Sequence, residues 1–397
     1  MISRVHIENF KSLVNFDLPP QGHPLGGFTC LIGMNGAGKS TLLQAFDFIA
    51  HVAIGKVQEW LRNRDWKKGE MVSHVGKKNP VITFTVEMRA KMGQTIVWHA
   101  RFNTAMLRCT QETILSNDEP ILKLEDGRLF VLNSSEGALR FDKVPFEYEG
   151  SVFSTLKLEG THPGIAEVKT KLQSLHSLEL LAPQLMRRRS RESEDIGPGG
   201  ERLAGFLSHL SEAQQEDLLT QIQSFYPEIV GWRVKKKQYG WKGLLVEERT
   251  MGGAEVGEGH INDAFLRVIA MLSQAYTRAG MLLLDEIENG MNPAMVGKLM
   301  DFLVALSRQG LQVIVTTHSP IILNFLDDEV AKEGVMLLYK NENGSTHACR
   351  YFDQPETLDK LRALGPGEVF ADTDLRKMVA RLAASAPEKE NHQTSGK

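Results

Sequence analysis

The hydrophobic positions along the chain follow two patterns, which predict two kinds of sheet. In the outer thirds of the sequence, short runs are almost wholly apolar, as at residues 28–32, 281–284 and 312–317. Such runs are typical of parallel strands that are buried on both faces. Between residues 78 and 157, apolar and polar residues alternate instead, and turn residues separate the alternating runs. This second pattern predicts an antiparallel lobe, distinct from the sheet of the outer thirds.

Helical patterns lie between the apolar runs of the outer thirds. One begins directly after the first run and extends to about residue 62. Another is expected to begin at Pro293 with Asn292 as its cap, because proline is favoured at the first helical position. Two short helices are expected after Pro355. Alternation of strands and helices in this order predicts an α/β fold.

The middle of the chain also contains a predicted insertion, at residues 186–250, with helices and one pair of strands. Residues 211–214 (Ser-Glu-Ala-Gln) fit a capping box at the start of one of these helices. A further short strand is expected at residues 178–182, where Pro183 ends it. No heptad pattern persists long enough for a coiled-coil arm.

Composition adds limits on location and partners. The 397 residues carry a formal net charge of −3, so any nucleic-acid binding would require a local basic patch. Cys30, Cys109 and Cys349 show neither metal-ligand spacing nor a disulfide framework, which favours a reducing compartment. We recognise no signal peptide and no membrane-spanning apolar run, so we expect a cytoplasmic protein without a membrane partner.

The strongest chemical signal follows the first apolar run. Residues 33–40 have the spacing Gly-x-x-x-x-Gly-Lys-Ser of a P-loop, between a predicted strand and a predicted helix. Glycines let backbone N–H groups surround a phosphate, Lys39 brings a positive charge to the β- and γ-phosphates, and the Ser40 hydroxyl is a ligand for Mg²⁺. The alternative, a chance glycine-rich turn, is disfavoured by this setting. The predicted ATP-binding residues are Asn35, Gly36, Ala37, Gly38, Lys39, Ser40 and Thr41.

Two later segments supply candidate catalytic groups. Asp285 and Glu286 directly follow a buried apolar run, as in a Walker B segment. Asp285 is predicted to hold the Mg²⁺ that Ser40 also contacts, and Glu286 is predicted to orient or deprotonate the attacking water. The next buried run leads to His318, which we expect to sense or hydrogen-bond the γ-phosphate. An acidic pair or a lone histidine is often structural, but the upstream P-loop favours catalytic roles for Lys39, Glu286 and His318.

The order of these motifs resembles a known family. Ile-Glu-Asn-Phe-Lys-Ser at residues 7–12 precedes the P-loop, and Leu-Leu-Leu-Asp-Glu-Ile-Glu-Asn-Gly-Met-Asn-Pro at residues 282–293 precedes Thr-Thr-His-Ser-Pro at residues 316–320. Residues 199–207 are similar to a Gly-x-Asn-Leu-Ala-x-x-Leu segment. This order resembles the ABC-type ATPases of the SMC, RecF and OLD group, and within it the armless "AAA family ATPase" branch typical of bacterial and prophage anti-phage defence loci. The resemblance extends over most of residues 1–325.

The resemblance implies a fold and a dimeric mechanism. The expected fold is a P-loop ABC-type ATPase head with a mixed central sheet, an antiparallel β-subdomain and a helical insertion, without a long coiled-coil arm. In this family two heads sandwich ATP, and a signature segment, typically Leu-Ser-Asp-Gly-Thr-Leu-Arg, completes the site of the other head. The matching segment carries Asn262, Asp263 and Ala264, so Asn replaces Ser and Ala replaces Gly. An Asn amide still donates to a γ-phosphate, whereas Ala hinders backbone approach, so trans completion with slow hydrolysis is implied.

Two alternatives stay open around this segment. Residues 261–267 also fit the start of an ordinary amphipathic helix. Asn292 stands where the family usually has His, so the resemblance implies for it only a helix cap and a place in an interface loop.

Three functions are compatible with these features. The first is an ATP-binding and hydrolysing dimeric switch or scaffold that controls a separate effector, a toxin or nuclease, in anti-phage defence. OLD nucleases as a family carry a Toprim domain after the ATPase, whereas here Glu368, Asp372 and Asp374 lie on a short helical segment. The second is a RecF- or SMC-like ATPase that binds duplex DNA in repair or recombination. The third is a scaffold that binds ATP with little turnover.

Two basic clusters bear on the DNA-binding alternative. Residues 186–191 and 233–237 are rich in Arg and Lys and are candidate contacts for duplex DNA, although such clusters are more often solvated surface. The predicted domain division is 1–77 and 251–354 for the two parts of the ATPase head, 78–185 for the antiparallel lobe, 186–250 for the insertion, 355–382 for a helical docking segment and 383–397 for a disordered tail.

Overall fold

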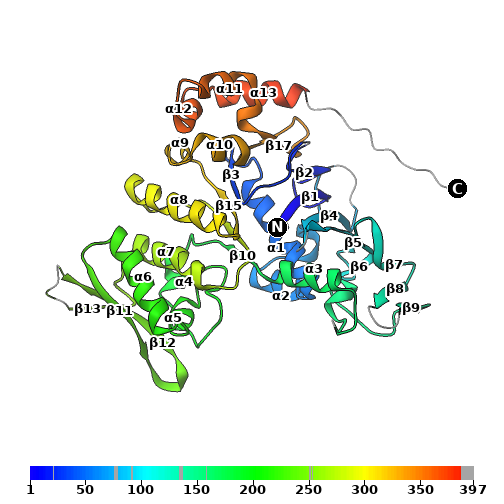
Figure 1. The fold of residues 1–397 in the computed structure, drawn as a ribbon, viewed down its shortest axis with the longest axis horizontal. Helices are drawn as coiled ribbons and strands as arrows, with labels where there is room; N and C mark the ends of the chain where they lie inside the picture. Colours follow the sequence, from blue (N-terminus) through cyan, green and yellow to red (C-terminus); the bar gives the residue numbers. More distant parts are fainter. Residues whose placement is uncertain are drawn as a thin grey trace.

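A computed structural model of the chain contains two large sheets, a smaller three-stranded sheet and surrounding helices (Figure 1). The structure describes residues 1–385 except 21, 76–78, 91–92, 134–136, 158, 250–251 and 253. Two of the predicted domain boundaries, 77/78 and 250/251, therefore lie outside the described residues, as does the predicted tail from residue 386 onward.

The central sheet has six strands among the described residues and is mixed, as the fold class predicted. Five strands are parallel, and β17 pairs antiparallel with β16 at one edge. In spatial order the strands are β10 (Leu175–Leu178), β14 (Met281–Leu284), β15 (Gln312–Thr316), β3 (Phe28–Ile32), β16 (Val335–Lys340) and β17 (Thr346–Arg350).

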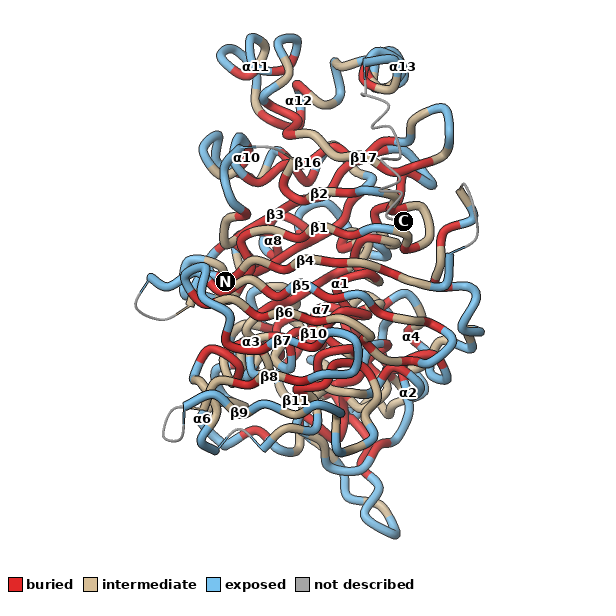
Figure 2. The backbone as a smooth tube through the Cα atoms, turned by 90° about the vertical axis from the view of Figure 1, so that its right-hand side faces the viewer, coloured by how far each residue is buried: buried red, intermediate tan, exposed pale blue. Residues whose placement is uncertain are grey.

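The apolar runs of the outer thirds become strands with both faces buried, because alternate residues enter two different cores. In β14, Met281 and Leu283 pack into one core and Leu282 and Leu284 into the other. The first core also contains α1 (Lys39–Ile54). The second contains α7 (Asp263–Leu272) and α8 (Pro293–Arg308). Figure 2 shows the buried positions concentrated along these strands.

The second large sheet is antiparallel and packs on the other side of α1. Its described strands are, in spatial order, β2 (Phe16–Leu18), β1 (Ile2–Glu8), β4 (Val81–Arg89), β5 (Thr95–Asn103), β6 (Arg108–Ser116), β7 (Glu119–Glu125), β8 (Arg128–Asn133) and β9 (Gly137–Phe141). The antiparallel lobe predicted from residue 78 thus also includes β1 and β2, because β4 pairs with β1 along its length. Helices α2 (Val57–Asn63) and α3 (Pro163–Gln173) flank this part of the fold.

The insertion forms a lobe of its own at one end of the molecule (Figure 1). The lobe contains α4 (Pro183–Met186), α5 (Leu203–Leu207), α6 (Glu212–Phe225) and the sheet β11 (Ile229–Lys236), β12 (Lys242–Glu248) and β13 (Glu255–Gly257). With α4 and β13 it extends beyond the predicted bounds of 186–250 at both ends. The capping box predicted at residues 211–214 is present at the start of α6. The strand predicted at residues 178–182 is wrong in its position: β10 ends at Leu178, and the following residues form a loop.

The C-terminal part folds over the edge of the central sheet. It contains α9 (Pro320–Leu323), α10 (Asp328–Gly334), α11 (Pro355–Leu361), α12 (Pro366–Ala371) and α13 (Leu375–Ser385). Three helices thus follow Pro355 where two were predicted, and α13 includes the first residues of the predicted tail. Short 3₁₀ segments elsewhere are Lys68–Glu70, Val152–Ser154, Gln238–Gly240, Ser273–Tyr276 and Tyr351–Asp353.

The longest helices among the described residues, α1 and α8, have 16 residues each, so this part of the chain contains no long coiled-coil arm. Within the same residues, no helix is both long and apolar enough to cross a membrane.

Candidate functional site

The predicted site residues lie at one edge of the central sheet. Strands β3, β14 and β15 are parallel neighbours or next neighbours, so their carboxyl ends meet at the same edge. The P-loop follows β3, Asp285 and Glu286 follow β14, and His318 follows β15. The structure therefore brings together three segments that are up to 285 residues apart, as His318 and Gly33 show.

The P-loop backbone has the conformation that its glycines allow. Gly33, Gly36 and Gly38 have φ angles of +146°, +75° and +108°. A Cβ at Gly33 would lie 2.3 Å from the carbonyl oxygen of Leu338 in β16, and one at Gly38 would lie 2.4 Å from Oγ1 of Thr346 in β17. Two of the glycines are thus required both by the turn and by its close packing against the β16–β17 hairpin.

The start of α1 is available to an anion. Its N-cap is Gly38, and no side chain of the described residues caps the helix. The first backbone N–H groups of a helix lack intrahelical partners and carry partial positive charge, which favours a phosphate. The predicted ATP-binding residues, 35–41, form this loop and the first turn of α1.

Lys39 is held in the loop by its own backbone. Its Nζ donates to the carbonyl oxygen of Gly33 at 2.9 Å and to that of Met34 at 3.3 Å, and it lies 3.3 Å from Nδ1 of His318. Burial lowers the pKa of Lys39, and the nearby carboxylates of Asp285 and Glu286 oppose this effect. Since an ammonium group only donates, this contact fits the tautomer of His318 that accepts at Nδ1 and carries its proton at Nε2.

Hydrogen bonds join the segment after β14 to the segment after β15. Thr316 Oγ1 donates to Asp285 Oδ1 at 2.5 Å and accepts from the backbone N–H of Glu286 at 2.8 Å. Glu286 has a positive φ of 48°, and its Oε1 lies 3.7 Å from Nε2 of His318. Lys39, Glu286 and His318 are therefore close neighbours, as their predicted shared role requires.

Sequence reasoning did not single out two polar residues of this site, Thr316 and Glu288. Glu288 Oε1 accepts from the backbone N–H of His318 at 2.7 Å and from Thr317 Oγ1 at 3.0 Å. The sequence pointed to Thr316 and Glu288 only through their place within the two motifs. Their contacts, with Asp285 and His318, join residues about thirty positions apart and leave no local pattern.

The predicted signature segment begins α7. Asn262 caps this helix, with its Oδ1 accepting from the backbone N–H groups of Ala264 at 2.8 Å and Phe265 at 3.3 Å. Asp263 forms an ion pair with Arg187, whose guanidinium also donates to the carbonyl oxygen of Ile261 at 2.7 Å. The amphipathic-helix interpretation thus describes the local structure, and the role in trans stays a prediction. Asn292 caps α8 through a bond from Met295 N to its Oδ1 at 3.0 Å.

Arg267 connects α7 to the site loops. It is buried, and its Nε donates to the carbonyl oxygen of Leu180 at 2.9 Å while its other nitrogens donate to Leu181 and Asn289. Leu180 and Leu181 lie in the loop after β10, and Asn289 lies after the Walker B strand. Arg267 therefore fixes the helix that begins with the predicted signature to two loops at the sheet edge where the P-loop lies.

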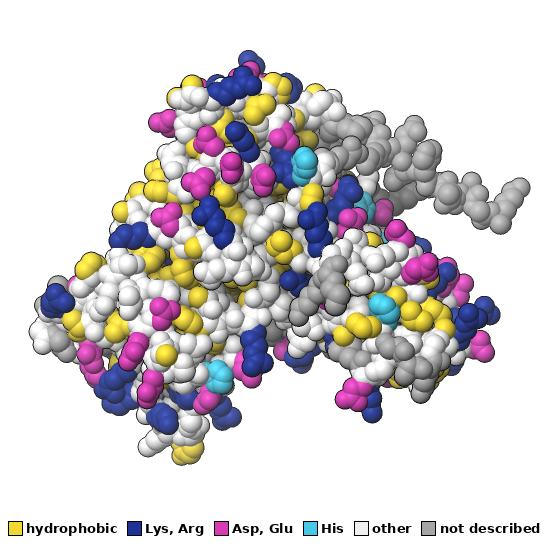
Figure 3. All heavy atoms as spheres, viewed as in Figure 1, with side chains coloured by type: hydrophobic (Ala, Val, Ile, Leu, Met, Phe, Trp, Pro, Cys, Tyr) yellow, Lys and Arg dark blue, Asp and Glu magenta, His cyan; other side chains and the backbone are white. Residues whose placement is uncertain are grey.

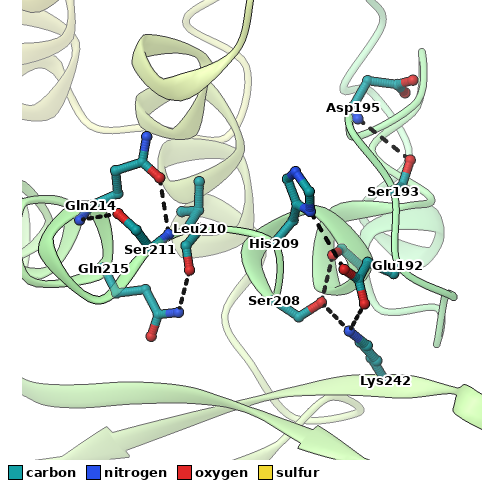
Figure 4. Close-up of polar contacts among 11 residues, drawn as sticks. Glu192, Ser193, Asp195, Ser208, His209, Leu210, Ser211, Gln214, Gln215 and Lys242 are labelled. Atoms are coloured by element: carbon teal, nitrogen blue, oxygen red, sulfur yellow. Dashed lines mark hydrogen bonds and ion pairs between the residues drawn. The ribbon is translucent and has the colours of Figure 1, made fainter.

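The two basic clusters come together in the fold, and four of their eight Arg and Lys side chains form ion pairs with acids: Arg187, Arg189, Arg233 and Lys237. The residues around Ser190 run beside β12, where Ser190 forms a bridge with Lys242. Lys242 is buried and donates to Glu192 at 2.8 Å and to Ser208 at 2.7 Å (Figure 4). Further ion pairs join Arg189 and Lys237 to Glu258, and Arg233 to Glu255. On the face drawn in Figure 3, side chains of both signs are interspersed over this lobe, which weakens the case for a phosphate-binding patch.

Comparisons with known proteins match two segments of the chain. Residues 1–92 match the family described as "AAA ATPase domain", and residues 255–324 match "AAA domain, putative AbiEii toxin, Type IV TA system". The two segments contain the P-loop, the Walker B residues and His318. An OLD nuclease of Thermus scotoductus is 43% identical over 49 residues, which are 12% of this chain and 8% of that protein.

Solved structures show the same fold at low identity. An SMC head bound to the C-winged helix domain of ScpA is 14% identical, with a TM-score of 0.55 over 87% of this chain and 97% of that one. An SMC head with an extended coiled coil, bound to the C-terminal domain of ScpA derived from Pyrococcus furiosus, is 12% identical, with a TM-score of 0.51 over 91% of this chain and 99% of that one.

Two segments of the chain thus match models of AAA-type ATPase domains, and the fold is similar to that of SMC heads. A short segment is also similar to an OLD nuclease, so these likenesses agree with the SMC and OLD resemblance of the motifs. The defence branch and the roles of single residues stay predictions.

Proposed function

We propose that two copies of this protein close on ATP and that hydrolysis releases them, so that the dimer works as a nucleotide-driven switch. The observation that carries this proposal is the cluster of Lys39, Glu286 and His318 beside the free start of α1. Such a cluster contains a phosphate-binding cation, a candidate base and a polar sensor within a few ångströms of each other. Positioning and charge neutralisation are what phosphoryl transfer to water requires from a protein.

Each residue has a distinct role in this proposal. Backbone N–H groups of residues 35–41 bind the phosphates, and Lys39 neutralises the charge on the β- and γ-phosphates. Glu286 orients the attacking water and accepts its proton, while His318 donates from Nε2 toward the γ-phosphate.

The residues present fit a Mg²⁺ ion. A serine hydroxyl (Ser40), an aspartate carboxylate (Asp285) and phosphate oxygens form the all-oxygen ligand set that Mg²⁺ prefers. The contact of Thr316 with Oδ1 of Asp285 orients this carboxylate and leaves its second oxygen for a ligand. When bound, the ion would neutralise charge on the phosphates.

A second copy is the proposed source of the remaining contacts. Two loops and the short helix α9 at the site edge carry apolar side chains that are strongly exposed for their type: Met34 at 41%, Leu181 at 42% and Ile321 of α9 at 44%. Apolar side chains around a polar site favour a protein surface that covers it. In this dimer Asn262, Asp263 and Ala264 complete the partner's site, with Ala264 slowing hydrolysis.

We further propose that the switch controls a separate effector, a toxin or nuclease, in anti-phage defence within the cytoplasm. Support comes from the AbiEii toxin description of the family matched at residues 255–324, and from the SMC heads, whose structures hold a domain of a second protein, ScpA. Helices α11–α13 are the proposed docking segment. The alternative, a RecF- or SMC-like ATPase of DNA repair, would require duplex DNA to bind although half of the side chains in the basic clusters are paired with acids.

The test compares the wild-type protein with Glu286→Gln and Lys39→Ala. Size-exclusion chromatography with light scattering should show an ATP-dependent dimer for Glu286→Gln and a monomer for Lys39→Ala. If Glu286→Gln stays monomeric with saturating ATP, the clamp is refuted. Retrieval from the native cell then separates the two functions. A co-purifying effector that is lost with Lys39→Ala supports the switch, and duplex DNA without a protein partner supports the repair function.

A further inference from the structure

Glu288 connects the two catalytic segments and is not itself among the predicted catalytic residues. It lies two residues after Glu286, in a compact turn where Asn289 N donates to the carbonyl oxygen of Glu286 at 3.0 Å. From this turn its carboxylate reaches the neighbouring strand end and accepts from His318 N at 2.7 Å and from Thr317 Oγ1 at 3.0 Å. Glu288 therefore connects the turn that carries the candidate base, Glu286, to the backbone of the candidate γ-phosphate sensor, His318.

These bonds hold the whole turn that carries His318. Thr317 Oγ1, which donates to Glu288, also accepts from the backbone N–H of Ser319 at 2.9 Å. Residues 317–319 are thus organised around a single carboxylate oxygen. Glu288 bonds the backbone of His318 and not its imidazole ring. The ring therefore contacts Lys39 on one side and Glu286 on the other.

The arrangement is costly for a purely structural contact. Oε1 of Glu288 accepts both bonds, while Oε2 is sealed from solvent and has no hydrogen-bond partner among the described residues. A buried polar atom without a partner carries a desolvation penalty, and the penalty is larger for a charged group. A residue kept at such a cost beside a catalytic cluster points to a role in function.

We propose that Glu288 is a positioning residue that fixes His318 relative to Glu286 and Lys39 and so sets the rate of ATP hydrolysis. This inference rests on the proposed function, in which His318 contacts the γ-phosphate. Glu288 acts through the backbone of His318 and through Thr317, and it contacts neither ATP nor water in this role. Its removal changes the catalytic geometry and leaves the P-loop, which binds the nucleotide, intact.

The test is a set of ATPase assays on purified full-length variants, with kcat and KM measured separately. Glu288→Ala removes the carboxylate oxygen that accepts both hydrogen bonds. We expect kcat to fall on the order of 10- to 100-fold with little change in KM, as expected when catalytic groups are displaced by about 1 Å. Glu288→Gln keeps an acceptor oxygen in the same place and should stay within a fewfold of wild type. Glu329→Ala, an exposed carboxylate on α10, is the matched control and should not change kcat.

A double-mutant cycle with His318→Ala separates positioning from other roles. If Glu288 acts through His318, its loss should add almost nothing in the His318→Ala background. An equal fall in kcat in both backgrounds would overturn the inference, and so would an unchanged kcat in Glu288→Ala. If Glu288→Ala lowers the melting temperature and raises KM in parallel, and Glu288→Gln restores neither, the inference is also overturned. Such a result would show that Glu288 has only a structural role.

The same set distinguishes the inference from the proposal beneath it. If His318→Ala hydrolyses ATP at the wild-type rate, the proposed role of His318 fails, whatever Glu288 does. If His318→Ala is slow and Glu288→Ala is not, only the inference about Glu288 fails.

Discussion

Alanine substitutions at two P-loop glycines should lower stability by unequal amounts, because an added Cβ meets different surroundings at the two positions. Gly33 and Gly36 both have positive φ, at +146° and +75°, so alanine at either position adopts a backbone conformation that disfavours a Cβ. That cost is about 1–2 kcal/mol for an L-residue. At Gly36 no atom of the described part of the chain lies within 4 Å of the added Cβ, so we expect no further cost.

At Gly33 the added Cβ would lie 2.3 Å from the carbonyl oxygen of Leu338. That atom is backbone in the middle of β16, so relief requires the P-loop and β16 to separate. Overpacking of this kind adds about 1–3 kcal/mol, which gives a total of about 2–5 kcal/mol for Gly33→Ala. Because the carbonyl oxygen of Gly33 also accepts from Lys39, the displacement should weaken ATP binding as well.

The assay is thermal unfolding of the nucleotide-free proteins, followed by calorimetric titration with ATP and Mg²⁺. Gly33→Ala should melt several degrees below Gly36→Ala and bind ATP more weakly. Gly69→Ala is the control, because Gly69 has neither a positive φ nor a neighbour within 4 Å of an added Cβ. Equal melting temperatures for the Gly33 and Gly36 variants would refute the close approach of the P-loop to β16.

Four further predictions follow from the site and the core. Lys39→Ala should weaken ATP binding by roughly 10- to 100-fold, since bonds to charged groups contribute about 1.5–3 kcal/mol; calorimetry measures this, and normal affinity would contradict the P-loop assignment. Glu286→Gln should bind ATP normally but turn over on the order of 100-fold or more slowly, in a steady-state ATPase assay. Asn262→Ala should slow turnover without weakening ATP binding by the monomer, whereas Asn262→Ser, which restores both a cap and a donor, should retain turnover. Glu112 is buried in the antiparallel lobe, and burial raises its pKa to about 7. The folded state keeps the proton on Glu112 up to about pH 7, whereas the unfolded state loses it above the usual pKa of 4.5. The contribution of Glu112 to stability should therefore fall by about 3 kcal/mol between pH 4.5 and 7 and then stay constant. Glu112→Gln should remove this pH dependence from melting curves, and an unchanged pH dependence would contradict it.

The features that the sequence predicted best are those decided by local pattern. The apolar runs became strands because both of their faces are buried, as the division of Met281–Leu284 between two cores shows. The P-loop was predictable because its glycines and lysine must follow in a fixed order between a strand and a helix. The meeting of Glu286 and His318 followed from the topology, since parallel strands end at one edge.

The features that the sequence did not predict depend on distant contacts. The apolar residues after Leu178 suggested a strand, but the carbonyl oxygens of Leu180 and Leu181 accept from Arg267 of α7 in place of a strand partner. The pairing of β1 with β4 joins segments on either side of the P-loop helix, so the boundary of the antiparallel lobe cannot be seen in composition. The contacts of Glu288 with Thr317 and His318 have no local pattern at all.

The unusual residues of the predicted signature segment would keep the chemistry that a trans contact needs. Asn262 uses its Oδ1 for the cap of α7, which leaves the Nδ2 amide as a donor that the cap does not use; a serine would use its oxygen for the cap and its proton as the donor. Asp263 would repel a phosphate if it were alone, but its carboxylate is paired with Arg187. Since the donor is retained and the negative charge is compensated, we expect Asn262 to complete a partner's site, with Ala264 as the residue that limits how closely the helix start approaches.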